Sequence, residues 1–131
     1  MAYTPDIPRL QDYPARPPGG ERPRISVITT VRNGEKTLAA TIASVRDQNL
    51  PGLEYIVVDA NSTDRTLEIV KSHPDTVTFW KSEKDRGISD GFNKGIALST
   101  GTFVTILNAD DWLSHGQIAA GISALERSGA D

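Results

Sequence analysis

The sequence predicts an α/β protein with a mainly parallel sheet and helices on both faces, and three observations support this fold class. Short apolar, β-branched runs occur four times after residue 24. Each run is followed by a segment whose apolar residues recur at helical spacing. The chain has 131 residues, 37% of them hydrophobic, which is enough to close one core. Strands that alternate with helices in this way pair in parallel through right-handed crossovers.

Residues 1–23 differ from the rest in composition and predict an arm outside the folded domain. They contain six of the eight prolines and the pair Gly19-Gly20. A segment of this composition does not form a packed core by itself. We therefore expect a proline-rich N-terminal arm over 1–23 and a folded domain over 24–131.

The first strand and helix are predicted within residues 25–49. The run ISVITTV at 25–31 is apolar and β-branched, which is typical of a strand buried on both faces. Leu38, Ile42 and Val45 then recur at helical spacing, and LPG at 50–52 ends the helix.

The second strand is predicted at 53–60, LEYIVVDA, with Asp59 at its end. The segment STDRTLEIVKSH at 62–73 predicts the second helix. It begins with Ser and Thr side chains that can cap a helix, and it carries Leu67 and Val70 on one face.

The third strand is predicted at 76–83, TVTFWKSE. In the helix that follows, 87–99, Ile88, Phe92 and Ile96 lie four residues apart and form an apolar stripe. Two glycines in the same segment weaken its helical propensity.

The fourth strand is predicted at 102–108, TFVTILN, and its apolar run indicates a buried strand. The fourth helix is predicted at 114–129. We expect Ile118, Ile122 and Leu125 to face the core.

The composition excludes several classes of protein. A net charge of −3, with basic residues scattered along the chain, gives no footprint for nucleic acid. The absence of cysteine excludes disulfides, thiolate zinc sites and a cysteine nucleophile. No apolar run approaches the roughly 20 residues that span a bilayer, and the N-terminus lacks the apolar centre of a signal peptide. The sequence thus predicts a cytoplasmic protein, at most peripheral to a membrane.

Polar and acidic residues gather where the predicted strands end. Ligands bind outside the carboxyl ends of the strands in a parallel sheet, and this rule selects four segments. They are 30–33, 59–64, 83–87 and 108–111. The segment RNGEKT at 32–37 matches neither the dinucleotide fingerprint nor the P-loop, so other groups must hold any bound phosphate.

Asp110 and Asp111 bring two carboxylates to the end of the fourth strand. Like charges repel, so the pair is tolerated only with solvent or a hard cation nearby. Mg²⁺ or Mn²⁺ takes one or two protein carboxylates and completes its coordination with water and phosphate oxygens. The alternative for Asp110 is an acid at the start of the following helix, favoured by the helix dipole. We expect Trp112 to pack and His115 to be solvated.

Other candidate residues also have simpler interpretations. Asp59, taken alone, would be a strand-end turn residue that bonds the backbone after it. Asp64 and Arg65 are expected to serve the start of the second helix. The charged residues within 85–90 either form a solvated loop or take part in function.

Four segments in this order resemble the nucleotide-binding half of family 2 glycosyltransferases, which have the Rossmann-like GT-A fold. The segments are SVITTVRNGEKTLAATIASVRDQ, EYIVVDANSTDRT, SEKDRGISDGFNKGIALSTG and TILNADD. Each motif is weak alone, but all four lie in register at the four predicted strand ends. The resemblance covers residues 24 to 115.

The resemblance implies a donor site and a metal site. In the family, Asp59 would face the base or ribose, Asp110 would approach the ribose, and Asp111 would hold Mn²⁺ or Mg²⁺ against the donor diphosphate. Residues 109–111, ADD, would be a variable form of the family's acid motif. The residues expected to bind the donor are Thr30, Asn33, Asp59, Asp85, Asn93 and Asp110.

The function implied is transfer of a sugar from a nucleoside-diphosphate sugar, with uridine preferred, to a glycan or lipid-linked acceptor. Arg32 stands where many members have an aromatic residue, and Ala60 where many have an acid or glycine, so the base is open. The family's acceptor-binding half and its catalytic carboxylate would follow the acid pair by many residues. We therefore expect a domain that is incomplete at its C-terminus, and the sequence nominates no general base for an inverting transfer.

Two other classes of function compete with an enzyme. One is a non-catalytic nucleotide-sugar-binding module or truncated remnant, which lacks the downstream carboxylate. The other is a phosphoacceptor receiver domain, which carries its acid pair after the first strand, where this chain has VRN at 31–33. The receiver domain is therefore disfavoured. An isolated half would expose one side of its sheet and should self-associate or be only marginally stable.

Overall fold

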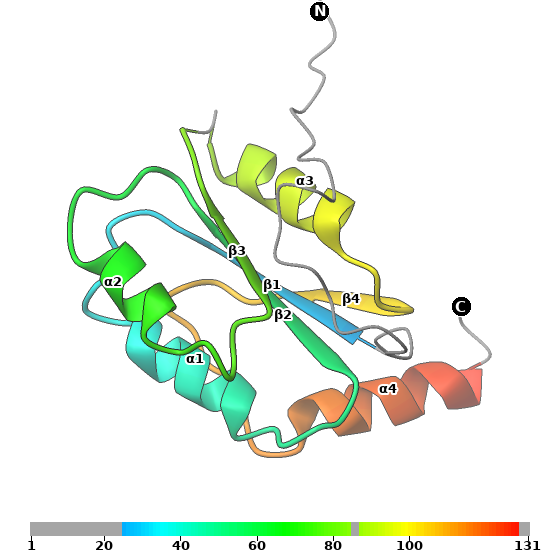
Figure 1. Cartoon of the computed structure of the whole chain (residues 1–131). Helices are drawn as coiled ribbons and strands as arrows, with labels where there is room; N and C mark the ends of the chain where they lie inside the picture. The colour runs from blue at the N-terminus through cyan, green and yellow to red at the C-terminus, as the bar shows by residue number, and fades with distance from the viewer. Residues whose placement is uncertain (1–24, 85–86, 129–131) are drawn as a thin grey trace, which may run out of the picture.

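The structure, a computed structural model, describes residues 25–84 and 87–128 (Figure 1). Strands and helices alternate along the chain, which confirms the predicted α/β class. The elements are β1 (Ile25–Val31), α1 (Leu38–Arg46), β2 (Leu53–Asp59), α2 (Thr66–Lys71), β3 (Phe79–Ser82), α3 (Ile88–Leu98), β4 (Phe103–Ile106) and α4 (Gln117–Ser128).

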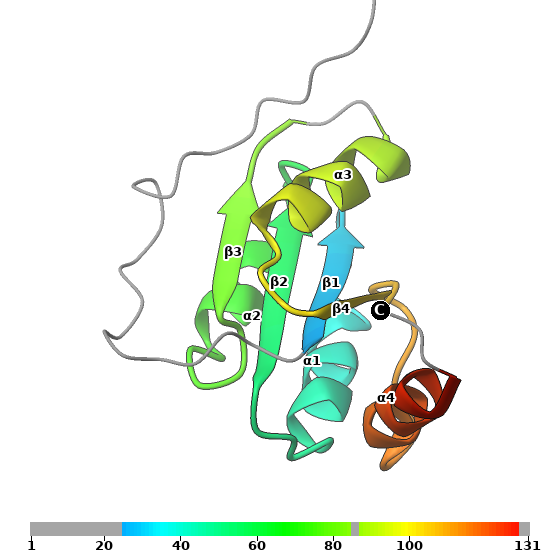
Figure 2. The ribbon, with the colours of Figure 1, turned by 90° about the vertical axis from the view of Figure 1, so that its right-hand side faces the viewer.

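The four strands form one parallel sheet in the order β3-β2-β1-β4. From β1 the chain first adds strands on one side and then returns to place β4 on the other side. Helices cover both faces, as predicted: α1, α2 and α4 lie on one face and α3 on the other (Figures 1 and 2). The arrangement is a doubly wound sheet.

The core has two layers, one on each face of the sheet. On the face of α1, the predicted residues Leu38, Ile42 and Val45 are all buried against β1 and β2. On the other face, Ile28 of β1 packs with Phe92 of α3. Every residue of β1 is buried, which confirms that this strand is covered on both faces.

The fourth strand departs from the prediction of a buried strand. Along β4 the residues alternate between half-buried and exposed, and Val104 and Ile106 are 43% and 50% exposed. The reason is position: β4 is at the edge of the sheet, and α3 packs mainly on β1 and β2 (Figure 2). One face of β4 therefore exposes apolar side chains at this edge of the sheet.

The buried face of α3 is centred on its glycines. Gly91 and Gly95 are buried, whereas Ile96 is 45% exposed, so the predicted apolar stripe is wrong at Ile96. A Cβ on Gly95 would lie 2.3 Å from Cγ2 of Ile28. The glycine thus allows the helix to approach the sheet closely. The side chain of Ile88, the first residue of the stripe, lies outside the described residues.

The fourth helix faces the core with only part of its predicted stripe. Ile118 and Ile122 are each 5% exposed, but Leu125 is 40% exposed, so the prediction for Leu125 is wrong. The second half of α4 extends past the amino ends of the strands (Figure 1), where no sheet lies beneath it.

A buried carboxylate anchors the connection between α3 and β4. Glu54 of β2 is 1% exposed and accepts hydrogen bonds from Ser26 Oγ, Thr100 N and Thr100 Oγ1 at 2.9, 3.0 and 3.0 Å. Ser26 Oγ in turn accepts a bond from Gly101 N at 2.9 Å. These bonds fix the chain where it enters the edge strand.

Within residues 25–84 and 87–128, no helix is long and apolar enough to cross a membrane.

The close packing of Gly101 gives a test of this anchor. A Cβ at Gly101 would lie 2.7 Å from Ser26 N, so Gly101→Ala should lower the free energy of unfolding by about 1–3 kcal/mol. Gly121→Ala is the matched control, because nothing lies within 4 Å of a Cβ there, and alanine in a helix should stabilise by about 1 kcal/mol. Denaturant unfolding measures both, and equal effects would contradict the packing described.

Candidate functional site

A hollow of about 440 Å³ opens at the carboxyl end of the sheet, beside β1 and the turn that follows β4. Because the strand order reverses between β1 and β4, this is the position at which doubly wound sheets bind ligands. The hollow is lined by Thr30, Val31, Arg32, Asn33, Gly34, Thr37, Asn108, Ala109 and Asp110. Three of the predicted donor-binding residues, Thr30, Asn33 and Asp110, are thus brought together.

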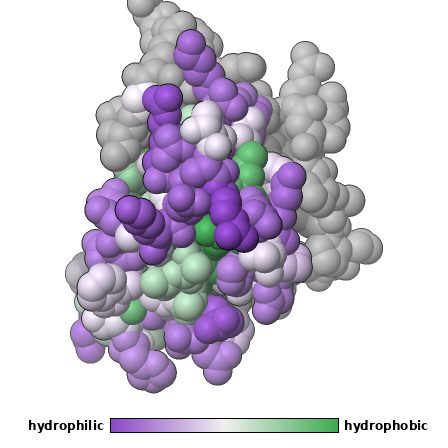
Figure 3. Space-filling view, turned by 90° about the vertical axis from the view of Figure 1, so that its left-hand side faces the viewer, coloured by the Kyte–Doolittle hydropathy of each residue, from purple (hydrophilic) through white to green (hydrophobic). Residues whose placement is uncertain are grey.

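The surface around the carboxyl edge is mainly hydrophilic. Figure 3 views the molecule from the side on which the loops after β1 and β2 lie, and hydrophilic side chains predominate there, with smaller apolar areas between them. Polar groups on such a face can fix the orientation of a bound ligand.

Asn33 joins the loops that follow β1 and β2. Its backbone N–H donates to Ser62 Oγ at 2.8 Å, and its side-chain oxygen accepts a bond from Thr63 N at 2.9 Å. Asn33 has a φ of 52°, in the left-handed region that asparagine tolerates better than most residues. Ser62 and Thr63, predicted to cap α2, serve this loop contact instead, and α2 begins at Thr66.

Asp59 is buried at the end of β2 and is surrounded by donors. It is 1% exposed, and its carboxylate accepts bonds from Ser62 N at 3.0 Å, from Ser62 Oγ and from Ser82 Oγ at 2.7 Å. The simpler interpretation, a turn residue that bonds the backbone after it, therefore describes its contacts. Its predicted contact with a base or ribose stays a prediction.

Two further pairs fasten the same loops together. Gly34 N donates to Thr66 Oγ1 at 2.9 Å, and Glu35 N donates to Asp64 Oδ2 at 3.2 Å. Asp64 also accepts from Thr66 N, so it serves the start of α2 as predicted. Partial desolvation would raise the pKa of Asp64, but the hydrogen bonds from Thr66 and Glu35 outweigh it and hold the pKa below its usual value.

Asp110 and Asp111 lie on a tight turn after β4, closed by a bond from Asp111 N to Asn108 O at 3.0 Å. Both side chains are exposed. Asp110 lines the hollow, while Asp111 lies beside it and accepts a bond from Trp112 N at 2.8 Å. We call residues 108–111 the acid turn.

The neighbours of the acid turn correct two expectations and agree with a third. Trp112 was expected to pack, but it is 67% exposed, so this prediction is wrong. Helix α4 begins at Gln117, so Asp110 is too far away to act as a helix N-terminal acid. His115 is exposed, as expected for a solvated histidine.

Helix α1 holds the segment that follows β4 through a row of polar side chains. Thr37 Oγ1 donates to Ala109 O at 2.8 Å, and Thr41 Oγ1 donates to Asp111 O at 2.6 Å. Farther along, Ser44 Oγ accepts a bond from Leu113 N, and Gln48 bonds both Ser114 O and Ile118 N. We call Thr37, Thr41, Ser44 and Gln48 the polar row. Sequence reasoning missed it, although the spacing of four, three and four is helical.

A charged cluster lies where β3 leads into α3. Lys94, 3% exposed, has its ammonium 3.0 Å from Glu83 and 3.4 Å from Asp90. Burial alone would lower the pKa of Lys94, but Glu83 and then Asp90 raise it above its ordinary value. Asn93 is exposed on the same helix and does not line the hollow, and Asp85 lies outside the described residues. Their predicted donor contacts stay predictions.

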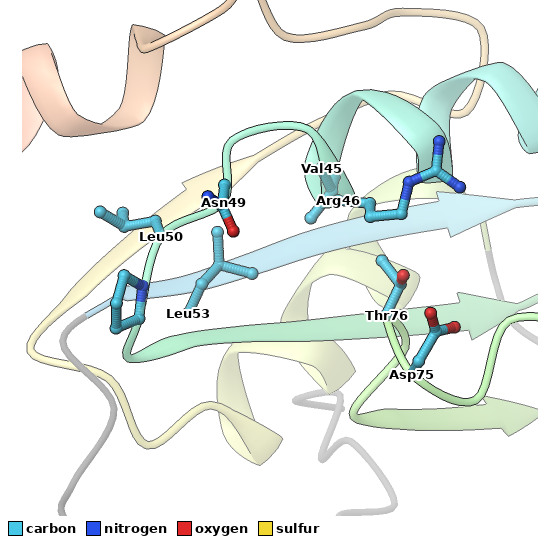
Figure 4. A pocket seen from close by; sticks show the side chains of 8 residues that line it. Val45, Arg46, Asn49, Leu50, Leu53, Asp75 and Thr76 are labelled. Atoms are coloured by element: carbon cyan, nitrogen blue, oxygen red, sulfur yellow. The ribbon is translucent and has the colours of Figure 1, made fainter.

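A second hollow, of about 320 Å³, lies at the opposite end of the sheet. Figure 4 shows the side chains around it, from the end of α1, the loop before β2 and the loop before β3. It is lined by Val45, Arg46, Asn49, Leu50, Pro51, Leu53, Asp75 and Thr76. Since it lies near the amino ends of the strands, the sheet rule does not favour it as the main ligand site.

The donor set of the acid turn fits a divalent cation that is shared with a substrate. No group of three or more His, Cys, Asp or Glu residues that could hold a metal occurs within the described ranges. Two adjacent carboxylates supply hard oxygen ligands but leave most octahedral positions open. A cation here would complete its coordination with water and phosphate oxygens, as Mg²⁺ does in nucleotide sites.

The model of Glycosyl transferase family 2 matches residues 26–131. The chain belongs to this family. A PGL/p-HBAD biosynthesis glycosyltransferase of Mycobacterium bovis is 31% identical over 105 residues, which cover 78% of this chain and 41% of the relative. A GalNAc(5)-diNAcBac-PP-undecaprenol beta-1,3-glucosyltransferase of Campylobacter jejuni is 32% identical over 74% of this chain and 33% of the relative. The chain therefore spans less than half the length of these family 2 relatives.

Solved structures of glycosyltransferases confirm the GT-A fold. The structure of S. aureus TarS 1-349 in complex with UDP-GlcNAc superposes with a TM-score of 0.75 and 25% identity, over 79% of this chain and 31% of the TarS 1-349 chain. The mannosyltransferase PcManGT of Pyrobaculum calidifontis, in complex with GDP-Man and Mn²⁺, superposes with a TM-score of 0.66 and 28% sequence identity. The superposition covers 90% of this chain and 34% of the PcManGT chain. This family 2 chain thus matches about a third of each structure.

The buried lysine of the charged cluster can be tested by substitution. Lys94→Met should lower the free energy of unfolding at pH 7 by about 3 kcal/mol, because it removes the buried cation that lies between Glu83 and Asp90. The pKa of Lys94 is raised above 10.5 in the folded chain, so its contribution is complete below pH 10.5 and is lost as the pH rises through the folded value. The difference in the free energy of unfolding between Lys94→Met and wild type should therefore become smaller above pH 10.5.

The matched control for this test is Lys36→Met, at an exposed lysine in the loop before α1. Denaturant unfolding at several pH values measures both variants. A Lys94→Met chain as stable as Lys36→Met at pH 7 would show that the cluster contributes nothing to folding.

Proposed function

We propose that this chain is the donor-binding half of a glycosyltransferase that takes a sugar from a nucleoside-diphosphate sugar. The observation that carries the proposal is the hollow at the strand-order reversal, where Thr30, Asn33 and Asp110 line one cavity beside the acid turn. The nucleotide would lie between the loop after β1 and this turn. The acceptor would be a glycan or a lipid-linked glycan.

The structural relatives support a nucleoside diphosphate but differ in its base. TarS is solved in complex with UDP-GlcNAc and PcManGT with GDP-Man. We propose uridine, by the resemblance of the motifs. Arg32 lines the hollow and could supply a planar cation beside the base or the diphosphate.

We assign the divalent cation, Mn²⁺ or Mg²⁺, to Asp111, with Asp110 toward the ribose. When bound, the cation stabilises negative charge on the departing diphosphate. The chain's own contribution is to hold the two carboxylates at the mouth of the hollow. Asp59, Asp85 and Asn93 complete the proposed donor site, with Asp59 reaching the base through a rearrangement of its bonds to Ser62 and Ser82.

We assign no general base among residues 25–84 and 87–128. An inverting transfer needs a base that takes the proton of the acceptor hydroxyl. Asp59 and Asp64 are occupied by loop hydrogen bonds, and Glu83 and Asp90 face Lys94. The alternative function is a non-catalytic nucleotide-sugar-binding module. Acceptor-dependent release of nucleoside diphosphate would distinguish the enzyme from that module.

Calorimetry with uridine diphosphate tests the proposed site. Binding should require Mn²⁺ or Mg²⁺ and should disappear with a chelator. Asp111→Asn should weaken the metal-dependent binding by one to two powers of ten, about 1.4 kcal/mol for each, because it removes one charge from the cation's ligands. Titration with guanosine and thymidine diphosphates tests the choice of base.

The matched control is Asp75→Asn, which makes the same change at the exposed opposite end of the sheet. It should bind uridine diphosphate as wild type does. If Asp75→Asn and Asp111→Asn bind equally well in the presence of Mn²⁺, the metal site is not at Asp111.

A further inference from the structure

The side chains of the polar row contact the backbone of the acid turn and do not contact the carboxylates of that turn. Thr37 Oγ1 donates to Ala109 O, and Thr41 Oγ1 donates to Asp111 O. The two carbonyls lie on either side of Asp110 in the chain. Thr37 thus bonds the peptide group between Ala109 and Asp110, and Thr41 bonds the peptide group between Asp111 and Trp112. The two acids lie between the two bonded carbonyls.

Thr41 is the more deeply buried of the two. It is 1% exposed, whereas Thr37 is exposed. Thr41 Oγ1 lies 2.6 Å from Asp111 O, 2.9 Å from Ala109 O and 3.3 Å from Thr37 O. A hydroxyl has one proton, so the shortest contact, to Asp111 O, is its main bond. Thr37, at 2.8 Å, then satisfies Ala109 O.

Fixing these two carbonyls fixes the orientation of the acids. Each carbonyl direction depends on the backbone dihedral angles of its residue, and the bond from Asp111 N to Asn108 O closes the turn. With three backbone groups bonded, the turn has little freedom to rotate. The Cα–Cβ bonds of Asp110 and Asp111 are held in one direction, and only rotation about the side-chain torsions remains to the carboxylates.

We propose that Thr41, assisted by Thr37, is a positioning residue that sets the acid turn in the geometry required by the metal-bound nucleoside diphosphate. This inference rests on the proposed function, because it assigns a role in binding that depends on the cation at Asp111. It adds that α1, which packs beside the hollow, controls how strongly the cation improves nucleotide binding. Thr41 touches neither the cation nor the nucleotide in this role.

The readout is the ratio of uridine diphosphate affinity with Mn²⁺ to the affinity with a chelator. Thr41→Val keeps the shape of the side chain but removes the donor. It should lower this ratio about tenfold, the equivalent of about 1.4 kcal/mol, while the metal-free affinity stays unchanged. Thr41→Ser restores the hydroxyl and should restore the ratio. A purely structural role would lower stability and leave the ratio as it is.

The matched control is Thr29→Val. Thr29 is a fully buried threonine of β1 whose hydroxyl shares a 2.8 Å hydrogen bond with Tyr55 OH, and it does not contact the acid turn. Its substitution removes the same group from the core and should lower the melting temperature. The Mn²⁺ ratio should remain that of wild type.

The outcomes separate this inference from the proposed function. If wild type shows the Mn²⁺ enhancement and Thr41→Val keeps it in full, the inference is wrong and the proposed function stands. If wild type shows no enhancement, the metal site is wrong and the inference fails with it. Should Thr41→Val fail to fold, Thr37→Val, at an exposed residue, reports on the same turn: a lowered ratio supports the inference and an unchanged one overturns it.

Discussion

The hydrogen bonds that satisfy the loop backbone at the carboxyl edge of the sheet are the constraint on which the site depends. Loops outside regular structure carry N–H and C=O groups that need partners when water is excluded. Here Ser62 and Thr66 accept bonds from the loop after β1, while Thr37 and Thr41 donate to the turn after β4. Loops from three parts of the sequence therefore form one surface around the hollow.

These bonds are possible because the strands beneath them pair in register. β1 pairs with β2 over seven residues, from Ile25 with Leu53 to Val31 with Asp59. The two loops therefore start side by side. At the other end of the sheet, Glu54 fixes the entry of the chain into β4 through Ser26 and Thr100. The core places the strands, and the hydroxyl and carboxylate bonds at the two ends place the connections.

The sequence predicted what periodicity can reveal. The alternation of strands and helices, and the buried residues Leu38, Ile42 and Val45, follow from local apolar spacing and were confirmed. Periodicity does not say which strand is at the edge or where a helix extends past the sheet. The exposure of Ile106 and Leu125 depends on exactly that tertiary arrangement and was predicted wrongly.

The candidate site, like the fold, was predicted from the sequence only in part. The rule that ligands bind at carboxyl ends brought Thr30, Asn33 and Asp110 to one hollow, because a parallel sheet aligns those ends. The polar row was not predicted, since a threonine on a helix looks solvent-facing until the turn that it holds is known. Asp59 shows the limit of residue type alone: a strand-end acid has the same sequence signature whether it bonds a loop or a ligand.

The central claim is that the carboxyl edge, at the acid turn, binds a metal-dependent nucleoside diphosphate. Paramagnetic broadening of backbone amide resonances by Mn²⁺, in the presence of uridine diphosphate, tests it most directly. The account predicts that the amides of Asn33, Gly34, Asn108 and Asp111 broaden first and that those of Asn49 and Asp75 stay sharp. Broadening centred on Asn49 and Asp75, at the opposite end of the sheet, would contradict it.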